Sequence, residues 1–189
     1  MNVGSSLLWA HSTIGRCLGF KSRKSVGSNP TALTKTNPTR SGFIMKKQEY
    51  MDLKKRHQKE FEEFPIAYAF NDKQLEEALE KLGATKEEVV SVFGHGDIVK
   101  RTDAKDLIKM MKRHDDELKQ KLIDDPDFAY EAFLYEMNNH EYAINWTADE
   151  DTLSALGITF DFIRKHGLRL AYDKARNKHF KLAEEWEMI

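Results

Sequence analysis

The segment PDFAYEAFLYEMNNHEYAINW, residues 126–146, decides the expected fold. Nearly every residue over 127–137 is apolar or aromatic, and only Glu131 and Glu136 interrupt the run. A helix on a protein surface has one apolar stripe, whereas a helix that is apolar almost all round is buried. The run is also too short to cross a bilayer. We therefore predict that it forms the central core helix of a globular protein.

This helix runs into a polar cluster at residues 138–142, Asn-Asn-His-Glu-Tyr. In a functional interpretation, His140 acts as a general base or a metal ligand that a carboxylate orients. Glu136 lies four residues before it and therefore shares its helix face. Glu141 and Asn139 add further oxygen donors. The cluster is the first candidate for an active site.

The same cluster also has a structural interpretation, which we favour. A zinc helix of the His-Glu-x-x-His type needs a second histidine one turn later, and position 144 is Ile. A histidine at a helix C-terminus interacts favourably with the helix dipole and with free carbonyls. Asn138 or Asn139 in the left-handed conformation would end the helix. We expect neither a metal nor a cofactor.

Charge is distributed unevenly along the chain. Residues 1–44 contain six Lys or Arg and no Asp or Glu, so residues 45–189 hold 24 basic and 31 acidic residues, a net charge of −7. An acidic protein is a poor candidate for a general nucleic-acid binder, because affinity for phosphate needs a positive field. The only cysteine is Cys17, which excludes disulfides and cysteine-based zinc sites from 45–189. We expect a cytoplasmic protein that does not bind a membrane.

The basic, serine-rich residues 1–44 are expected to be a disordered extension, because they contain too little apolar pattern to offset the entropy of ordering. An organellar transit peptide is one interpretation. We favour another, in which these residues are a spurious translation through a tRNA gene. Gly-Ser-Asn-Pro at 27–30 is what a T-arm encodes, and Ile-Gly-Arg at 14–16 is what a D-loop encodes. Met45 is then the expected start.

Apolar spacing and capping residues predict further helices within 45–189. The first three expected helices are 46–64, which ends before Pro65; 71–82, with Asn71 or Asp72 as its cap and Gly83 at its end; and 86–93, capped by Thr85 with Glu88. The next expected helix is capped by Thr102 or Asp103 and continues to Leu122. A short helix at 149–156 is ended by Gly157, and a long closing helix starts after Thr159.

Two shorter stretches complete the expected fold. Residues 66–70 are apolar and could form a buried strand or a connector, and the alternation at 142–146 could form a strand that pairs with it. Residues 94–98 form a predicted turn that lacks the flanking strand and helix of a phosphate-binding glycine loop. The prediction is a mainly α fold, one compact helical domain over 45–189, with a minor two-stranded β element.

The closing helix has a basic face over residues 164–181, and Arg169, Lys174 and Arg176 are its candidate nucleic-acid ligands. The alternative, which we favour, is a surface helix whose basic residues complement an otherwise acidic protein.

Four runs of the sequence resemble an uncharacterised family of small bacterial proteins that occurs in phage-like and conjugative elements. These runs are residues 65–71, 74–79, 135–142 and 151–159. The Asn-His-Glu-Tyr motif at 139–142, followed by a Leu-Gly-x-Thr corner, is the most specific part. The resemblance covers most of 45–189, and it implies a genetic setting and no mechanism.

Three functions are therefore carried forward. The leading one is a non-enzymatic accessory or interaction protein of a bacterial mobile element or phage, with a protein partner. The second is a small metal-dependent or hydrolytic enzyme that uses His140, Glu141 and Glu136, with Asn139 and Tyr142 as binding residues. The third is nucleic-acid binding through the basic face at 164–181. The sequence gives no oligomeric state.

Overall fold

The computed structural model describes residues 38–145 and 147–186, with side chains from Met45 onward. The described chain is mainly helical and contains a small antiparallel sheet, which confirms the predicted fold class. The expected extension over 1–44 lies largely outside the described residues. The first helix, α1 (Pro38–Glu62), begins before the expected boundary at Met45.

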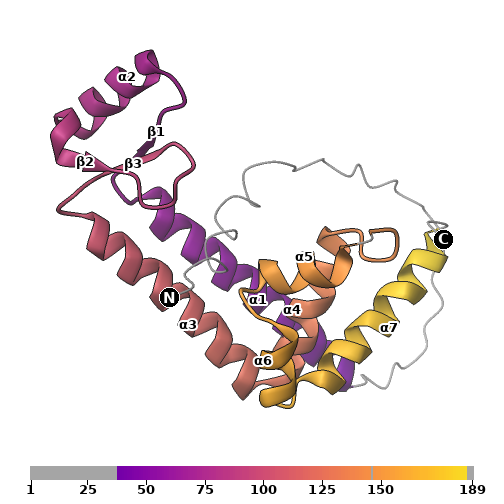
Figure 1. Cartoon of the computed structure of the whole chain (residues 1–189). Helices are drawn as coiled ribbons and strands as arrows, with labels where there is room; N and C mark the ends of the chain where they lie inside the picture. The colour runs from indigo at the N-terminus through magenta and orange to yellow at the C-terminus, as the bar shows by residue number, and fades with distance from the viewer. Residues whose placement is uncertain (1–37, 146, 187–189) are drawn as a thin grey trace, which may run out of the picture.

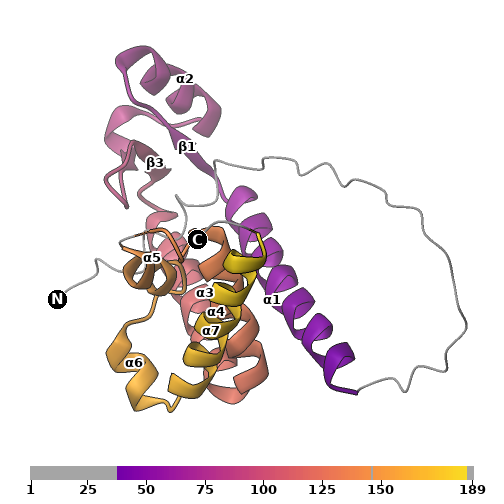
Figure 2. The ribbon, with the colours of Figure 1, turned by 90° about the vertical axis from the view of Figure 1, so that its right-hand side faces the viewer.

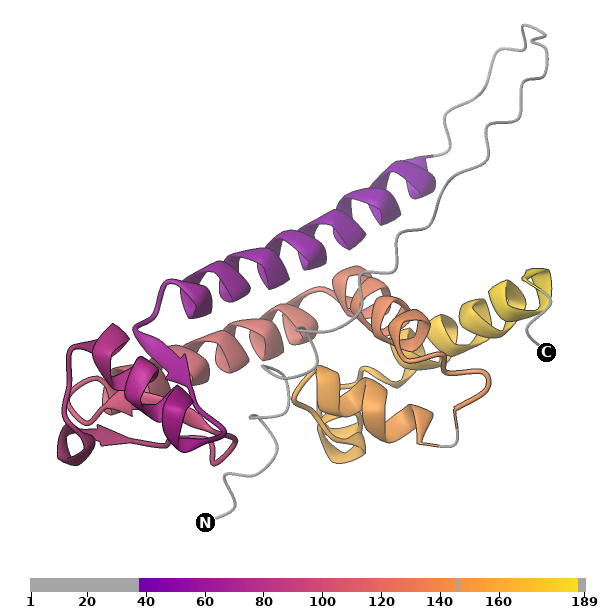
Figure 3. The ribbon, with the colours of Figure 1, turned by 90° about the horizontal axis from the view of Figure 1, so that it is seen from above.

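Two long helices form the frame of the molecule. α1 lies antiparallel beside α3 (Ala104–Asp124), as Figures 1 and 3 show. Charged side chains join the two helices along their length; the pairs are Lys46–Asp125, Glu49–Lys121, Arg56–Glu117 and Glu60–Arg113. The sequence predicted both helices, although α1 ends at Glu62 rather than at residue 64.

A small α/β unit connects these two helices and projects beyond the helical body in all three views (Figures 1, 2 and 3). It contains, in chain order, β1 (Ile66–Tyr68), α2 (Asp72–Leu82), the 3-10 turn η2 (Lys86–Glu88), β2 (Val89–Val90) and β3 (Asp97–Lys100). The sheet order is β1-β3-β2, and both pairings are antiparallel. α2 packs against one face of the sheet, where Ala67, Ala78, Leu82 and Ile98 form an apolar cluster.

The predicted β element was wrong in its partner and in its size. Ile66 pairs with Val99 of β3, whereas residues 140–144 form turns. The predicted helix over 86–93 was also wrong, because it shortens to η2 and continues as β2. The capping box between Thr85 and Glu88 is present, but the β-branched Val89-Val90 pair fits a strand better than a helix.

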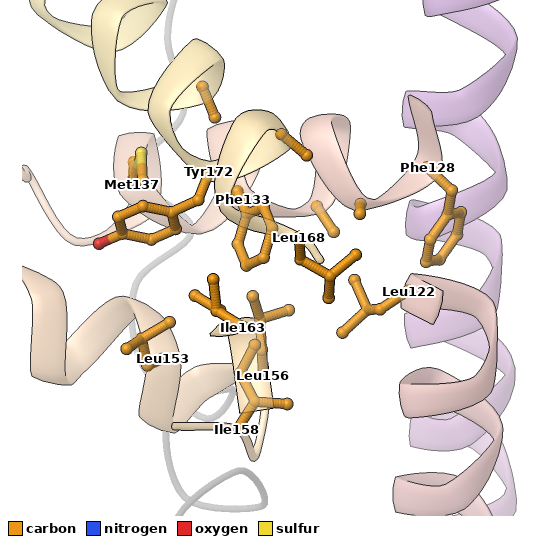
Figure 4. Close-up of a cluster of buried hydrophobic side chains, with 14 of the residues drawn as sticks. Leu122, Phe128, Phe133, Met137, Leu153, Leu156, Ile158, Ile163, Leu168 and Tyr172 are labelled. Atoms are coloured by element: carbon orange, nitrogen blue, oxygen red, sulfur yellow. The ribbon is translucent and has the colours of Figure 1, made fainter. Parts of the chain in front are cut away.

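The predicted central helix is confirmed as α4 (Pro126–Asn139). Its N-cap is Asp125, whose side chain accepts hydrogen bonds from the N–H groups of Asp127 and Phe128. α4 packs against α1, α3, α5 (Ala148–Ala155) and α7 (Arg169–Glu185). Figure 4 shows the core that these helices enclose together with α6 (Phe160–Lys165); it includes Leu122, Phe133, Met137, Leu156, Ile163, Leu168 and Tyr172.

The expected single closing helix is divided into α6 and α7. Gly167 lies between them with a φ of 69°, a left-handed conformation that a helix cannot continue through. The predicted helix ends at Gly83 and Gly157 and the predicted cap at Thr159 are confirmed. Gly83 and Gly157 end their helices with φ values of 57° and 62°, and Thr159 accepts a hydrogen bond from Phe162 N. In the part of the chain that the structure describes, no helix has the length and apolar character needed to cross a membrane.

Candidate functional site

The last turn of α4 places Glu136 in a buried polar network. Its Oε1 accepts hydrogen bonds from the Tyr50 hydroxyl at 2.5 Å and from Lys54 Nζ at 2.6 Å, both on α1. Its Oε2 lies 3.4 Å from Asn139 Nδ2 and 3.6 Å from His140 Nε2. Glu136 and Tyr50 are fully buried. The structure therefore brings together three of the predicted site residues, Glu136, Asn139 and His140.

The electrostatics of this network keep Glu136 ionised. Burial alone would raise the pKa of its carboxyl group, but His140, the charge of Lys54 and the Tyr50 hydroxyl outweigh burial and lower this pKa to about 2. Burial and the nearby Glu136 carboxylate raise the pKa of Tyr50 well above its usual value. A general base works best with a pKa near the working pH. The Glu136 carboxylate therefore has the character of a structural anion that joins α4 to α1.

The rest of the Asn-His-Glu-Tyr motif forms the turn after α4. His140 N donates to Glu136 O at 3.0 Å, and Tyr142 N donates to Met137 O at 3.0 Å. The prediction that Asn138 or Asn139 takes the left-handed conformation was wrong, because Glu141 takes it with a φ of 51°. The Glu141 side chain is exposed, whereas Glu136 is buried.

His179 of α7 holds this turn in place. Ala143 N donates to His179 Nε2 at 3.0 Å, so Nε2 is an acceptor and Nδ1 carries the proton that is donated to Asn138 Oδ1 at 2.7 Å. The imidazole is therefore neutral in this arrangement, and burial lowers its pKa. Asn138 thus uses its side chain to join the last turn of α4 to α7.

Tyr142 belongs to a second group of contacts at this turn. Its hydroxyl donates to Asp149 Oδ1 at 2.5 Å, and the Tyr172 hydroxyl donates to the same oxygen. The Arg176 guanidinium lies 6.0 Å from the Tyr142 ring centroid and 5.8 Å from that of Phe180. Two of the predicted binding residues, Tyr142 and Arg176, are thus in contact, and both help to pack α7 against the turn.

The basic face at 164–181 is partly neutralised by its own helix. Arg169 pairs with Asp173 at 2.8 Å, and Arg164 pairs with Asp161. Lys174 lines a separate groove of about 510 Å³ together with Tyr130 and Leu168. Arg169, Lys174 and Arg176 are exposed, but each has different neighbours. Paired acidic residues reduce the positive field that binding to a phosphate backbone needs.

The loop at 94–96 has its anion-binding groups already occupied. The buried Asp97 carboxylate accepts hydrogen bonds from Val92 N at 2.7 Å, Phe93 N at 3.1 Å, His95 N at 3.3 Å and Ser91 Oγ at 2.9 Å. Burial would raise the pKa of Asp97, but these hydrogen bonds lower it. An internal carboxylate therefore fills the position that a phosphate would take in an amide nest.

The structure also reveals a pair of motifs that the sequence analysis missed. Arg-His-x-x-Glu occurs at 56–60 on α1 and again at 113–117 on α3. The rings of His57 and His114 stack with centroids 4.0 Å apart and planes 6° apart. The signal that could have found this pair is the exact repetition of the motif on two predicted helices.

Each motif binds the glutamate of the other, and we call this arrangement the histidine clamp. His57 Nε2 lies 3.0 Å from Glu117 Oε2, and His114 Nε2 lies 2.9 Å from Glu60 Oε2. Arg56 and Arg113 pair with the same two glutamates. Burial would raise the pKa of Glu117, but Arg56 and His57 lower it to about 2. The clamp fixes the antiparallel register of α1 and α3, the helices that carry the α/β unit.

A groove of about 330 Å³ lies between β1 and α2 on the α/β unit. It is lined by Ala67, Tyr68, Phe70, Gln74, Glu77, Ala78 and Lys81. The Phe70 side chain is 74% exposed. A Cβ atom on Gly96 would lie 2.7 Å from Phe70 Cε1, so the absence of a side chain at Gly96 makes room for the ring. Residues 66–70 were expected to form a buried strand or a connector, and neither expectation includes this groove.

Among the described side chains, no group of three or more His, Cys, Asp or Glu is placed to hold a metal ion.

Comparisons with known proteins give one match. No curated protein and no solved structure matches the chain. A family model described as a family of unknown function, DUF7659, matches residues 49–178, which include the histidine clamp, the β1–α2 groove and the Asn-His-Glu-Tyr motif. Because this match covers most of the sequence, the chain belongs to that family of unknown function.

Proposed function

We propose that the chain is a non-enzymatic accessory protein of a bacterial mobile element or phage, and that it binds a protein partner at the β1–α2 groove. One observation carries the proposal: a phenylalanine ring, Phe70, that is 74% exposed beside a groove. Aromatic side chains, Phe among them, are enriched at the centres of protein–protein interfaces. Two observations support the mobile-element setting. Residues 14–16 and 27–30 are what the arms of a tRNA gene would encode, and the sequence resembles a family that occurs in phage-like and conjugative elements.

The position of the groove also supports this proposal. The α/β unit projects from the helical body, so that a partner can reach it without meeting the other helices (Figure 2). Tyr68 is also partly exposed, which extends the aromatic surface along β1. The groove lining contains one acid, Glu77, one base, Lys81, and the amide of Gln74 besides its apolar groups. A mixture of polar and apolar groups is typical of protein interfaces.

The Glu136–His140 network gives less support to an enzyme. Glu136 has a pKa of about 2, and its oxygens already contact Tyr50, Lys54 and Asn139. A catalytic carboxylate needs an oxygen that is available to the substrate. We therefore assign to this network the stability of the α1–α4 contact.

The test is partner capture with a matched pair of variants. Phe70→Ser removes the exposed ring, and Ile108→Ser removes a side chain of α3 that is 54% exposed and does not line the groove. Each variant of the full chain is used to capture partners from the native host. The partner found is then titrated by calorimetry. We expect Phe70→Ser to weaken binding roughly tenfold or more, as loss of an aromatic anchor does, and Ile108→Ser to leave it unchanged. Equal binding by both variants would contradict the proposal.

A further inference from the structure

The free edge of β1 defines the kind of partner that this groove accepts. We propose that an extended segment of another protein adds to this edge as a fourth strand of the sheet, with α2 as the second wall. This inference rests on the proposed function, and it specifies the chemistry of the partner: a strand recognised through its backbone, with an apolar side chain at alternate positions.

The hydrogen-bonding pattern of the sheet shows which groups of β1 face outward. The sheet order β1-β3-β2 leaves one side of β1 without a neighbouring strand. Ala69 N donates to Gly96 O at 2.8 Å, and Ala67 is paired with Ile98 in the same register. In an antiparallel pair, alternate residues direct their N–H and C=O groups toward the partner strand and away from it. Tyr68 therefore directs its N–H and C=O toward the free edge.

The other edge of the sheet, β2, is less suited to pair with an added strand. β2 has only two residues, and the N–H groups of Val92 and Phe93 that follow it are held by the Asp97 carboxylate. At β1, the flanking N–H groups are also occupied, because Ile66 N donates to Phe64 O at 2.7 Å and Phe70 N donates to Gln74 Oε1 at 2.8 Å. Tyr68 is thus the residue of β1 whose N–H is placed for an added strand.

The walls of the groove match an added strand. Strand addition obtains affinity from main-chain hydrogen bonds and specificity from pockets for alternate side chains. Ala67, Tyr68 and Phe70 come from the β1 side, and Gln74, Ala78 and Lys81 come from α2. The apolar surface of Tyr68 and Phe70 suits an apolar side chain. β1 has three residues. A segment of roughly five residues, the usual length of a strand, is therefore long enough to pair with all of β1.

The probe for this proposal is a blocked synthetic hexapeptide with alternating Val and Thr residues. Two further versions carry backbone N-methyl groups, one on every Val and the other on every Thr. Binding to the ¹⁵N-labelled chain is followed by NMR. We expect the unmethylated peptide to shift the Tyr68 amide and the amides of residues 74–81. We expect one N-methylated version to bind roughly tenfold weaker, because it loses the N–H groups that face β1, and the other to bind like the parent.

A pair of protein variants tests the same edge without the probe. Tyr68→Pro removes the outward N–H, and a proline is tolerated on an edge strand where its nitrogen faces solvent. Tyr68→Ala removes the same side chain and keeps the N–H. We expect Tyr68→Pro to bind the peptide more weakly than Tyr68→Ala, with thermal unfolding showing that both variants are folded.

Several results would overturn the proposal of strand addition. They are no peptide binding at millimolar concentration, equal binding by all three peptides, or shifts centred away from β1 and α2. Self-association that Tyr68→Pro abolishes would assign the edge to a second copy of this chain and would also overturn it. If Phe70→Ser loses the native partner but Tyr68→Pro keeps it, strand addition fails and the proposed function stands. If neither variant affects the native partner, the proposed function fails as well.

Discussion

Replacing Glu136 with alanine is expected to lower the free energy of unfolding by about 3 kcal/mol, the scale seen when one partner of a buried ion pair is removed. The variant leaves Lys54 without its carboxylate and the buried Tyr50 hydroxyl without its acceptor. The Lys54 side chain is 19% exposed and can reach water, which places the loss at the lower end of the usual range.

Urea unfolding followed by circular dichroism measures this change. Glu76→Ala on α2 is the control, because Glu76 is exposed and its substitution is expected to change stability by less than about 0.5 kcal/mol. The pKa of Glu136 is about 2 in the folded chain and about 4.3 in an unfolded one. Its stabilisation is therefore complete above about pH 5 and is lost as the pH falls toward 2. Similar stability of Glu136→Ala and Glu76→Ala would show that the network contributes nothing.

Replacing Glu117 with alanine is expected to lower the free energy of unfolding by about 2 kcal/mol, because hydrogen bonds to charged groups contribute more than neutral ones. Glu117 binds Arg56 and His57 across the α1–α3 contact. Without Glu117, the buried His57 loses the contact of its Nε2 atom with this carboxylate. Asp116→Ala, at the exposed neighbouring position, is the control and is expected to have little effect. Equal stabilities for the two variants would contradict the assigned role of the clamp.

The clamp also predicts a pH dependence of stability. Burial lowers the pKa of His57, and so do the charges of His114 and Arg56, whereas Glu117 acts in the opposite direction. The folded chain therefore binds this proton less readily than the unfolded chain does, so stability is full above about pH 6.5 and declines as the pH falls through the folded pKa. Urea titrations at pH 7.5 and pH 5.5 measure the effect, which we expect to shrink when His57 and His114 are both replaced by Phe. An unchanged pH dependence in that double variant would contradict it.

Local signals in the sequence were enough to predict most helices. The all-round apolar run identified α4, and Gly83, Gly157 and Thr159 marked helix ends because caps act within a few residues. The polar motif after α4 was also interpreted correctly as the place where the helix ends. The residue in the left-handed conformation was missed, because Glu141 is an unusual choice for it.

The missed features depend on contacts between distant segments. The first two residues of β3 were assigned to a turn, because this short segment carries no clear alternation and becomes a strand only between β1 and β2. The histidine clamp joins motifs on two separate helices, and the groove beside the exposed Phe70 ring forms only where β1 and α2 meet. Periodicity within one segment cannot show how two such segments meet.

Amide hydrogen exchange of the chain with and without its captured native partner tests the central claim most directly. This measurement separates the three candidate surfaces within one sample. We predict that the partner protects β1 and α2, residues 66–70 and 74–81, and leaves residues 136–145 and 164–181 unchanged. Protection centred on the Glu136–His140 turn, or on the basic face of α6 and α7, with no change at β1 and α2 would contradict it.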